Sequence, residues 1–130
     1  MQHPNIDFVQ GLYAAYLRGD REQVTAALAP DIHWHNSGYD AYAGTVEGIP
    51  AVLDYLMGED HLEDYRLEVV DMLASDERVA IVARASGRRG TRHVTNDFVQ
   101  VVRLHDGRVA EVWNYNWDQR TLAEVFPAAA

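Results

Sequence analysis

The sequence lacks cysteine, long apolar runs and an excess of basic residues, and each absence excludes a class of function. Without cysteine there is neither a disulfide framework nor a thiolate for catalysis or metal binding. No apolar run approaches the roughly 18 residues that a membrane span needs, so we expect no membrane partner. The N-terminal decapeptide MQHPNIDFVQ has no basic segment followed by an apolar one. We therefore expect no secretory signal and a cytoplasmic protein.

The charge balance is acidic, with 20 Asp and Glu against 11 Lys and Arg and a net charge of −9. Such a chain repels phosphate backbones, so we expect no nucleic-acid partner. The chain has 130 residues, of which 48% are hydrophobic. This length suits one domain with its own core, and no linker or repeat divides it. We expect a single domain over residues 1–130.

The first half of the chain has helical patterning. Residues 6–18 place apolar side chains at a 3.6-residue period, with Asn5 or Asp7 as the expected cap and Gly19 beyond the end. Asp20 is positioned to cap a second short helix, whose apolar stripe runs to Leu28. A short strand over residues 31–36 and an irregular loop follow. Pro50 then opens a third helix.

From residue 65 the period changes to two, which indicates strands. Alternating segments over residues 65–72 and 79–85 are followed by a long hairpin over residues 91–118. Asp106-Gly107 at its centre is a strong hairpin signal. Asp118 can cap a last helix that Pro127 ends. The order predicts an α+β fold: a cone-shaped α+β barrel with three N-terminal helices packed on a curved, mostly antiparallel sheet, and a short C-terminal helix.

Three segments resemble the nuclear transport factor 2-like superfamily, and within it the branch of SnoaL-like polyketide cyclases related to ketosteroid isomerases. They are LYAAYLRGDREQVTAALAPDIHWHNSG, the Ala43-Gly44 and Glu47-Gly48 pairs, and DGRVAEVWNYNWD. The resemblance covers nearly the whole chain. It implies a conical half-barrel around an apolar cavity, often dimeric through the outer sheet face. Its members include isomerases, cyclases, epoxide hydrolases, dehydratases and non-catalytic binding domains.

The catalytic positions of ketosteroid isomerases are not kept in this sequence. Aligned through Gly19-Asp20, their tyrosine falls on Leu12, their base on Asn36 and their oxyanion acid near Gln100. Asn36 cannot take a proton, so the isomerase triad is absent. The cyclases use an aspartate aided by a histidine, for which Asp97 and Asp40 are the nearby candidates. These reactions need no cofactor, and we expect none.

A set of neutral amides shares the predicted inward face of the sheet with apolar side chains. Such a pocket suits a carbonyl or hydroxyl ligand, although the same amides can instead tie the sheet and loops together. The expected ligand-binding residues are Tyr13, Trp34, Asn36, Asn96, Phe98, Gln100, Val112 and Asn114.

His35 and Asp97 are the candidate catalytic residues. A histidine changes charge near neutral pH, and His35 ends a strand at the expected cavity mouth. If Asn36 faces inward, strict alternation turns His35 outward unless a bulge intervenes. Asp97 lies in an apolar strand, where an ion pair with Arg84 is the structural alternative to catalysis. His33 and His35 could chelate zinc, but no third ligand follows, so we expect no metal.

The sequence thus favours a protein that binds a small, largely apolar, oxygenated molecule of polyketide-, steroid- or terpenoid-like chemistry. Cofactor-free acid-base cyclisation, isomerisation or dehydration is the expected reaction. A non-catalytic ligand-binding or dimeric interaction domain of the same fold is the alternative. The outward aromatic side chains Trp113, Tyr115 and Trp117 predict a homodimer through the outer sheet face.

Overall fold

The computed structural model describes residues 1–129, which form four helices and one six-stranded sheet. The helices are α1 (Pro4–Leu17), α2 (Arg21–Ala26), α3 (Ile49–Met57) and α4 (Gln119–Val125). The strands are β1 (Leu28–Asn36), β2 (Gly44–Glu47), β3 (Glu63–Ala74), β4 (Arg78–Arg89), β5 (Arg92–His105) and β6 (Arg108–Asn116).

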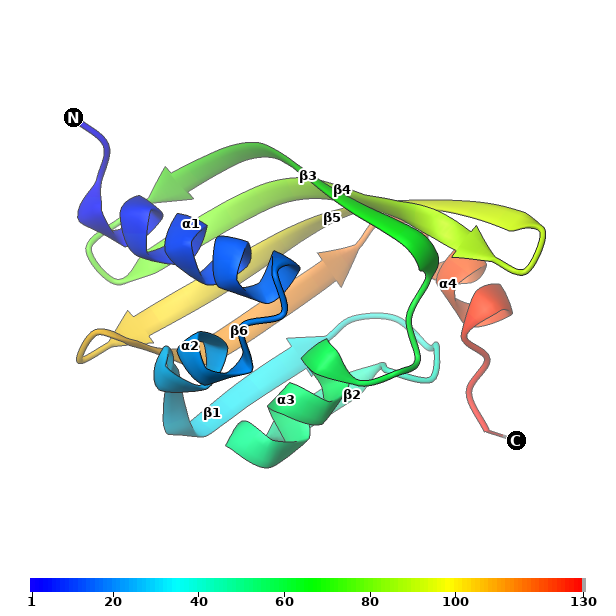
Figure 1. The fold of residues 1–130 in the computed structure, drawn as a ribbon, viewed down its shortest axis with the longest axis horizontal. Helices are drawn as coiled ribbons and strands as arrows, with labels where there is room; N and C mark the ends of the chain where they lie inside the picture. The colour runs from blue at the N-terminus through cyan, green and yellow to red at the C-terminus, as the bar shows by residue number, and fades with distance from the viewer. Residues whose placement is uncertain (130) are drawn as a thin grey trace.

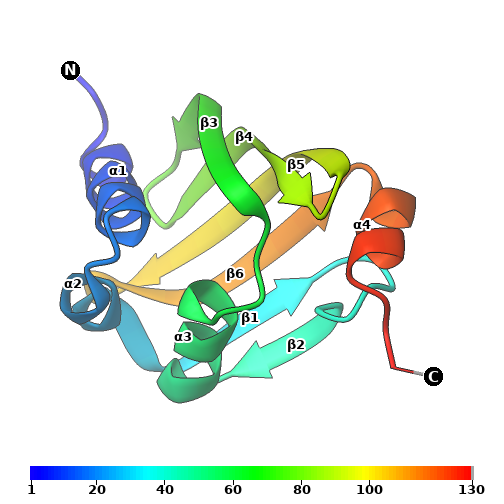
Figure 2. The ribbon, with the colours of Figure 1, turned by 45° about the vertical axis from the view of Figure 1, so that its right-hand side comes forward.

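The sheet is curved and open, with the strand order β2-β1-β6-β5-β4-β3 (Figure 1). Neighbouring strands are antiparallel, except that β1 runs parallel to β6. Helices α1, α2 and α3 cover the concave face, and α4 lies at one end of the sheet (Figures 1 and 2). The predicted α+β class is confirmed. The barrel is a half-barrel, because β2 and β3 are edges that do not pair with each other.

Local sequence signals set several element ends as expected. Asp106 and Gly107 have φ angles of 51° and 73°, the left-handed pair that a tight hairpin turn requires. Gly19 ends α1 with φ 73°. Asp20 accepts a hydrogen bond from the Gln23 backbone N–H at 3.1 Å, and so caps α2. These turns fix where each apolar stripe begins.

Three features of the elements differ from the sequence prediction, and strand pairing over long sequence distances accounts for the second and third. Helix α1 begins at Pro4 and is capped by His3 rather than by Asn5 or Asp7. Helix α2 ends at Ala26, and Leu28 instead begins β1 and pairs with β6. Strand β2 lies in the segment predicted to be an irregular loop. It is a short, mostly exposed edge strand, so it has no apolar alternation to reveal it.

The main core lies between the helices and the concave face of the sheet. Val9 of α1, Ile32 of β1, Val52 of α3 and Ile81 of β4 are fully buried there. Burying a side chain of this size contributes roughly 1.5–3 kcal/mol. Inward and outward residues alternate strictly along the first half of β4. The core therefore fixes which face of each strand is turned toward the helices.

A second, smaller core cluster holds α4 at the end of the sheet. It joins Leu62, Val94, Val125 and Phe126. Gly87 on β4 makes this packing possible, since a Cβ there would lie 2.7 Å from Leu62 Cβ. The segment before β3 can thus cross β4 closely and bring Leu62 beside the C-terminal helix.

Among residues 1–129, no helix has the length and apolar character to cross a membrane.

Candidate functional site

A cavity of about 520 Å³ lies between the helices and the concave sheet face. Its volume falls in the range of small-molecule pockets, on the order of 300–1,000 Å³. The eight pocket residues that the sequence predicts, Tyr13, Trp34, Asn36, Asn96, Phe98, Gln100, Val112 and Asn114, all line it. Most of the remaining wall is apolar and comes from α1, α2, α3 and the sheet, with Leu12, Val24, Leu28, Leu56, Met57, Leu67, Ala85, Val102 and Val109.

A chain of hydrogen bonds crosses the cavity wall from α1 to β5. The Tyr13 hydroxyl donates to Gln100 Oε1 at 2.8 Å. Gln100 Nε2 donates to Asn114 Oδ1 at 3.4 Å, and Asn114 Nδ2 donates to Asn116 Oδ1 at 3.1 Å. Asn96 Nδ2 donates to the same Asn116 oxygen at 2.9 Å. The amides are thus neutral partners for one another inside an otherwise apolar space.

A second polar group surrounds Asn36 at the end of β1. The Trp34 indole Nε1 donates to Asn36 Oδ1 at 3.0 Å, and the Tyr55 hydroxyl donates to the same oxygen at 3.2 Å. Both rings also contact each other, with centroids 5.7 Å apart. Asn36 is therefore held by two donors from different elements, β1 and α3.

Two buried amide atoms in the cavity wall have no hydrogen-bond partner among the described residues. They are Asn36 Nδ2 and Asn96 Oδ1. Their residues are only 8% and 9% exposed. A buried polar atom without a partner costs about 1–3 kcal/mol, so each of these two atoms lowers the stability of the folded chain.

Asp40 is the carboxylic acid that lines the cavity from the loop after β1. Burial raises the pKa of its carboxyl group, and backbone N–H groups, among them those of Tyr42 and Ala43, oppose that rise in part. Asp60 also borders the cavity but is half-exposed and ion-paired with Arg89 at 2.7 Å. Asp40 is consequently the acid whose proton affinity the cavity itself increases.

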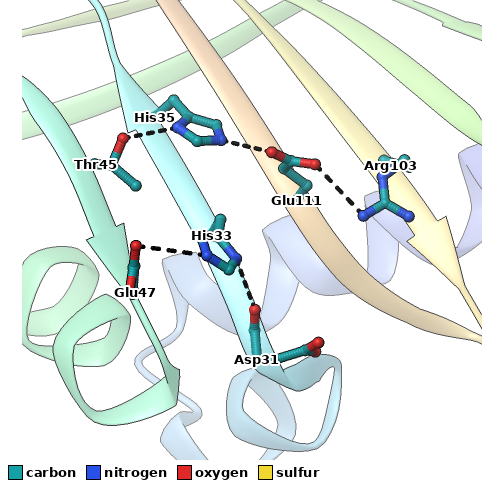
Figure 3. A network of polar contacts seen from close by, with 7 residues as sticks. All are labelled: Asp31, His33, His35, Thr45, Glu47, Arg103 and Glu111. Atoms are coloured by element: carbon teal, nitrogen blue, oxygen red, sulfur yellow. Dashed lines mark hydrogen bonds and ion pairs between the residues drawn. The ribbon is translucent and has the colours of Figure 1, made fainter.

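His35 lies on the outer face of the sheet and does not line the cavity. Its Nε2 contacts Glu111 Oε2 at 2.6 Å and its Nδ1 contacts Thr45 Oγ1 at 2.8 Å (Figure 3). The ring also stacks on Trp113. Strand β1 pairs with β6 in unbroken register from His33 to Asn36, so no bulge turns His35 inward. The pKa of the Glu111 carboxyl is lowered, chiefly by its hydrogen bond with His35.

Asp97 also lies on the outer face, in a groove formed by β3 to β6. Arg84 of β4 holds it in a bidentate pair, with Nε at 2.6 Å from one oxygen and Nη2 at 3.1 Å from the other. The pair lowers the pKa of the Asp97 carboxyl, and the Arg84 hydrogen bond is the main cause. The structure therefore brings the predicted amides together but places the two predicted catalytic residues elsewhere.

Among residues 1–129, no three His, Asp or Glu side chains converge closely enough to hold a metal ion.

The sequence pattern of the SnoaL-like domain matches residues 9–112, which is most of the chain. The chain belongs to the SnoaL-like domain family. This confirms the predicted membership of the nuclear transport factor 2-like superfamily and of its SnoaL-like branch.

Three proteins illustrate the similarities of this SnoaL-like domain. An uncharacterised protein of Mycobacterium tuberculosis is 26% identical over 117 residues, covering 88% of this chain and 89% of the relative. The crystal structure of an NTF2-like protein of unknown function from Burkholderia pseudomallei superimposes with a TM-score of 0.83 at 26% identity, over 98% of this chain and 100% of that chain. TerC co-crystallised with polyporic acid gives a TM-score of 0.80 at 20% identity, over 97% and 100%.

Sequence patterns in the SnoaL-like domain left some cavity residues unassigned. Tyr55 follows Val52 by three positions and thus lies on the apolar stripe of α3, a signal that could have found it. Tyr65 begins the period-two pattern of β3 and also lines the cavity. The sequence names Asp40 as a candidate acid but does not predict that its side chain lines the cavity. It sits in an irregular loop, where no periodicity shows its direction.

Tyrosines that line the cavity make the stability of the SnoaL-like domain sensitive to alkaline pH. Burial is the main cause that raises the pKa of Tyr13, Tyr55 and Tyr65 from the ordinary value of 10.0. Burial, with a hydrogen bond to Asp60, raises the pKa of Tyr42 to about 12. Because the unfolded chain loses these protons first, stability is present below pH 10.0 and is lost as the pH rises above it.

We predict that the free energy of unfolding falls above pH 10.0 by on the order of 1 kcal/mol per pH unit for each phenol that stays protonated in the folded state. Urea unfolding across this pH range, followed by tyrosinate absorbance, measures the effect. The Tyr55→Phe variant removes one such phenol and reduces the slope. Equal tyrosinate formation in folded and unfolded chains would contradict the prediction.

Proposed function

We propose that this SnoaL-like protein binds a small, largely apolar, oxygenated molecule in its central cavity, of polyketide-, steroid- or terpenoid-like chemistry. The observation that supports this proposal is the combination of an apolar wall with a chain of neutral amides in a cavity of about 520 Å³. Apolar walls supply affinity, and a few placed polar groups supply orientation.

The charges around the cavity support the same class of ligand. The amide chain is neutral throughout and contains no basic side chain that would pair with a phosphate or carboxylate. Neutral amide side chains form hydrogen bonds without charge, and such groups suit the carbonyl and hydroxyl oxygens of a ligand. TerC, similar in fold, has been co-crystallised with polyporic acid. That likeness supports a bound organic molecule in this fold.

Cavity binding is tested with two matched tryptophan variants on β4. Ala85 lines the cavity, whereas Ala80 is partly buried and lies outside its lining. Ala85→Trp fills the cavity and is expected to abolish binding of estrone, an anthraquinone or a terpenoid epoxide in calorimetric titration. Ala80→Trp is expected to leave it unchanged. Failure of every probe to bind the unaltered protein, or equal binding by both variants, would contradict the proposed function.

Acid-base catalysis at Asp40 is the second candidate, favoured by its place in the cavity and its raised pKa. A carboxyl group with a raised pKa exchanges protons closer to neutral pH, as general acid-base catalysis requires. Asp40 would take a proton from carbon next to a substrate carbonyl and return it during isomerisation, cyclisation or dehydration. No cofactor takes part in this scheme. It transfers to Asp40 the role that the sequence suggested for Asp97.

We predict that Asp40→Asn lowers kcat at least about 100-fold on a converted substrate, the scale of general acid-base catalysis. Asp97→Asn and His35→Gln, which alter the outer face, are expected to change kcat by less than about twofold. Steady-state kinetics on all three variants separate the candidates. A large loss with Asp97→Asn or His35→Gln and none with Asp40→Asn would assign catalysis to the outer face instead. Binding without any conversion would leave the ligand-binding function alone.

We further propose a homodimer through the outer sheet face, with a second copy of this chain as the occupant. Apolar side chains there are strongly exposed: Trp117 is 86%, Val70 65% and Tyr115 53% accessible. They border one groove, together with the mutually neutralising Arg84–Asp97 pair. The charged residues that line the groove are one base, Arg84, and two acids, Glu68 and Asp97, so the local charge that two copies bring together there is small.

Trp117→Glu is expected to convert the dimer into a monomer, because it places charge in the centre of an apolar contact. Light scattering over a range of concentrations measures the mass. Tyr39→Glu is the matched control, since Tyr39 is a 59% exposed aromatic residue outside both the groove and the cavity lining. A monomer before any substitution would rule out the proposal.

A further inference from the structure

We infer that residues 58–61 form a flap over the cavity and that the Asp60 carboxylate is its latch. The flap follows α3 and ends before the buried Leu62. A ligand enters and leaves when Asp60 releases the Tyr42 hydroxyl and the Arg89 guanidinium. The inference rests on the proposed ligand-binding function, since it assigns an entrance to that same cavity.

The cavity reaches solvent beside the flap. Its exposed lining residues lie in two places, the end of α1 and the stretch that runs from α3 into β3. They are Leu17, Gly19, Gly58, Asp60, His61 and Tyr65. Figure 2 shows this stretch as the connection that rises from α3 to β3. The flap therefore forms one rim of the opening.

Asp60 joins the flap to three other segments. Its carboxylate accepts hydrogen bonds from Arg89 Nη1 at 2.7 Å and from the Tyr42 hydroxyl. The Arg89 guanidinium lies 4.4 Å from the centre of the Phe126 ring, and the Tyr42 ring packs edge-on against the same ring. One carboxylate thus connects the flap with the loop after β1, the end of β4 and the segment after α4.

The backbone of the flap is held to the fold mainly at its two ends. Among residues 1–129, no backbone-to-backbone hydrogen bond involves Asp60 or His61. Beyond the flap, the Leu62 side chain is buried beside Phe126 in the small core cluster. Residues 58–61 can therefore move between two fixed points, the end of α3 and Leu62, when the contacts of Asp60 break.

The latch is suited to breaking and re-forming at neutral pH. The Asp60 and Arg89 side chains are 51% and 39% exposed, and an ion pair of this exposure is weak and screened by salt. The Tyr42 hydrogen bond, followed by that from Arg89, holds the pKa of the Asp60 carboxyl group below its ordinary value. The carboxylate therefore stays ionised, and opening needs no change of protonation.

The first test labels a single thiol inside the cavity and needs no ligand. The chain has no cysteine, so Ala85→Cys introduces one thiol into the cavity lining, and the rate of labelling by N-phenylmaleimide measures access to it. Two latch variants, Asp60→Ala and Arg89→Met, are made in this background. Each is expected to raise the labelling rate about threefold to tenfold, the scale of losing an exposed ion pair and its hydrogen bond.

Arg88→Met is the matched control. Arg88 also pairs with acids of the stretch after α3, Glu63 at 2.7 Å and Asp64 at 3.0 Å, but both acids follow the buried Leu62. None of these three charged residues lines the cavity. The control is expected to change the labelling rate by less than about twofold, as expected of an exposed ion pair away from the opening. Equal acceleration by the control, or no acceleration by either latch variant, would overturn the inference.

Salt distinguishes the latch from a general loosening of the fold. Raising sodium chloride from about 0.05 M to about 1 M screens the Arg89–Asp60 pair and is expected to speed labelling of Ala85→Cys, but not of the same chain carrying Arg89→Met. Each rate is divided by that of the urea-unfolded chain in the same salt. Salt-independent labelling of Ala85→Cys would contradict the flap, and this comparison holds even if a latch variant fails to fold.

The second test connects the flap to the proposed function. Estrone is mixed with the unaltered protein and with each latch variant, and protein tryptophan fluorescence, to which Trp34 of the cavity contributes, follows binding. The latch variants are expected to raise kon and koff together, about threefold to tenfold, and to leave Kd within about twofold, because they lower the barrier and not the bound contacts. A rise in koff alone would make Asp60 a ligand contact and overturn the inference. If no probe binds the unaltered protein, the proposed function fails, while the labelling rates still decide whether the flap opens.

Discussion

Unbroken register over residues 33–36 of β1, 98–103 of β5 and 111–116 of β6 is the constraint on which the rest of this structure depends. A one-residue shift in a strand would exchange its inner and outer faces. In β1 the register holds from His33 to Asn36, which turns Trp34 and Asn36 toward the cavity and His35 toward Glu111. The same alternation divides β5, where Gln100 enters the cavity and Asp97 meets Arg84. The neutral polar interior and the charged outer face are thus two consequences of one register.

The cavity wall combines groups with opposite effects on stability. Its apolar side chains continue the core, while its amides lose water and must find partners. Tyr13, Gln100, Asn114 and Asn116 largely satisfy one another. The unpaired atoms remain at the ends of these arrangements. The amides of the cavity wall therefore satisfy most, but not all, of their hydrogen-bonding capacity within the fold.

The end of the cavity brings together parts of the chain that are far apart in sequence. The loop that carries Asp40 is hydrogen-bonded to the C-terminal segment. The Ala41 N–H donates to the Phe126 carbonyl oxygen at 2.8 Å. Phe126 in turn packs against Tyr42 and beneath the Arg89 guanidinium. Helix α4 therefore supports the acid-bearing loop as well as the small core cluster. The position of the loop that carries Asp40 is a consequence of this packing.

The sequence by itself determined the α+β class, the main helices and strands, the Asp106-Gly107 turn and the place of eight residues in the cavity lining, because period, turn chemistry and family resemblance are local or aligned properties. It missed β2 and assigned Leu28 to a helix, because pairing with distant strands decided both. It named His35 and Asp97 as the catalytic candidates. Only the tertiary structure decided that these two lie on the outer face and that Asp40 lines the cavity. The physical reason is that a side chain's face depends on strand register, and a loop's position depends on packing against remote segments.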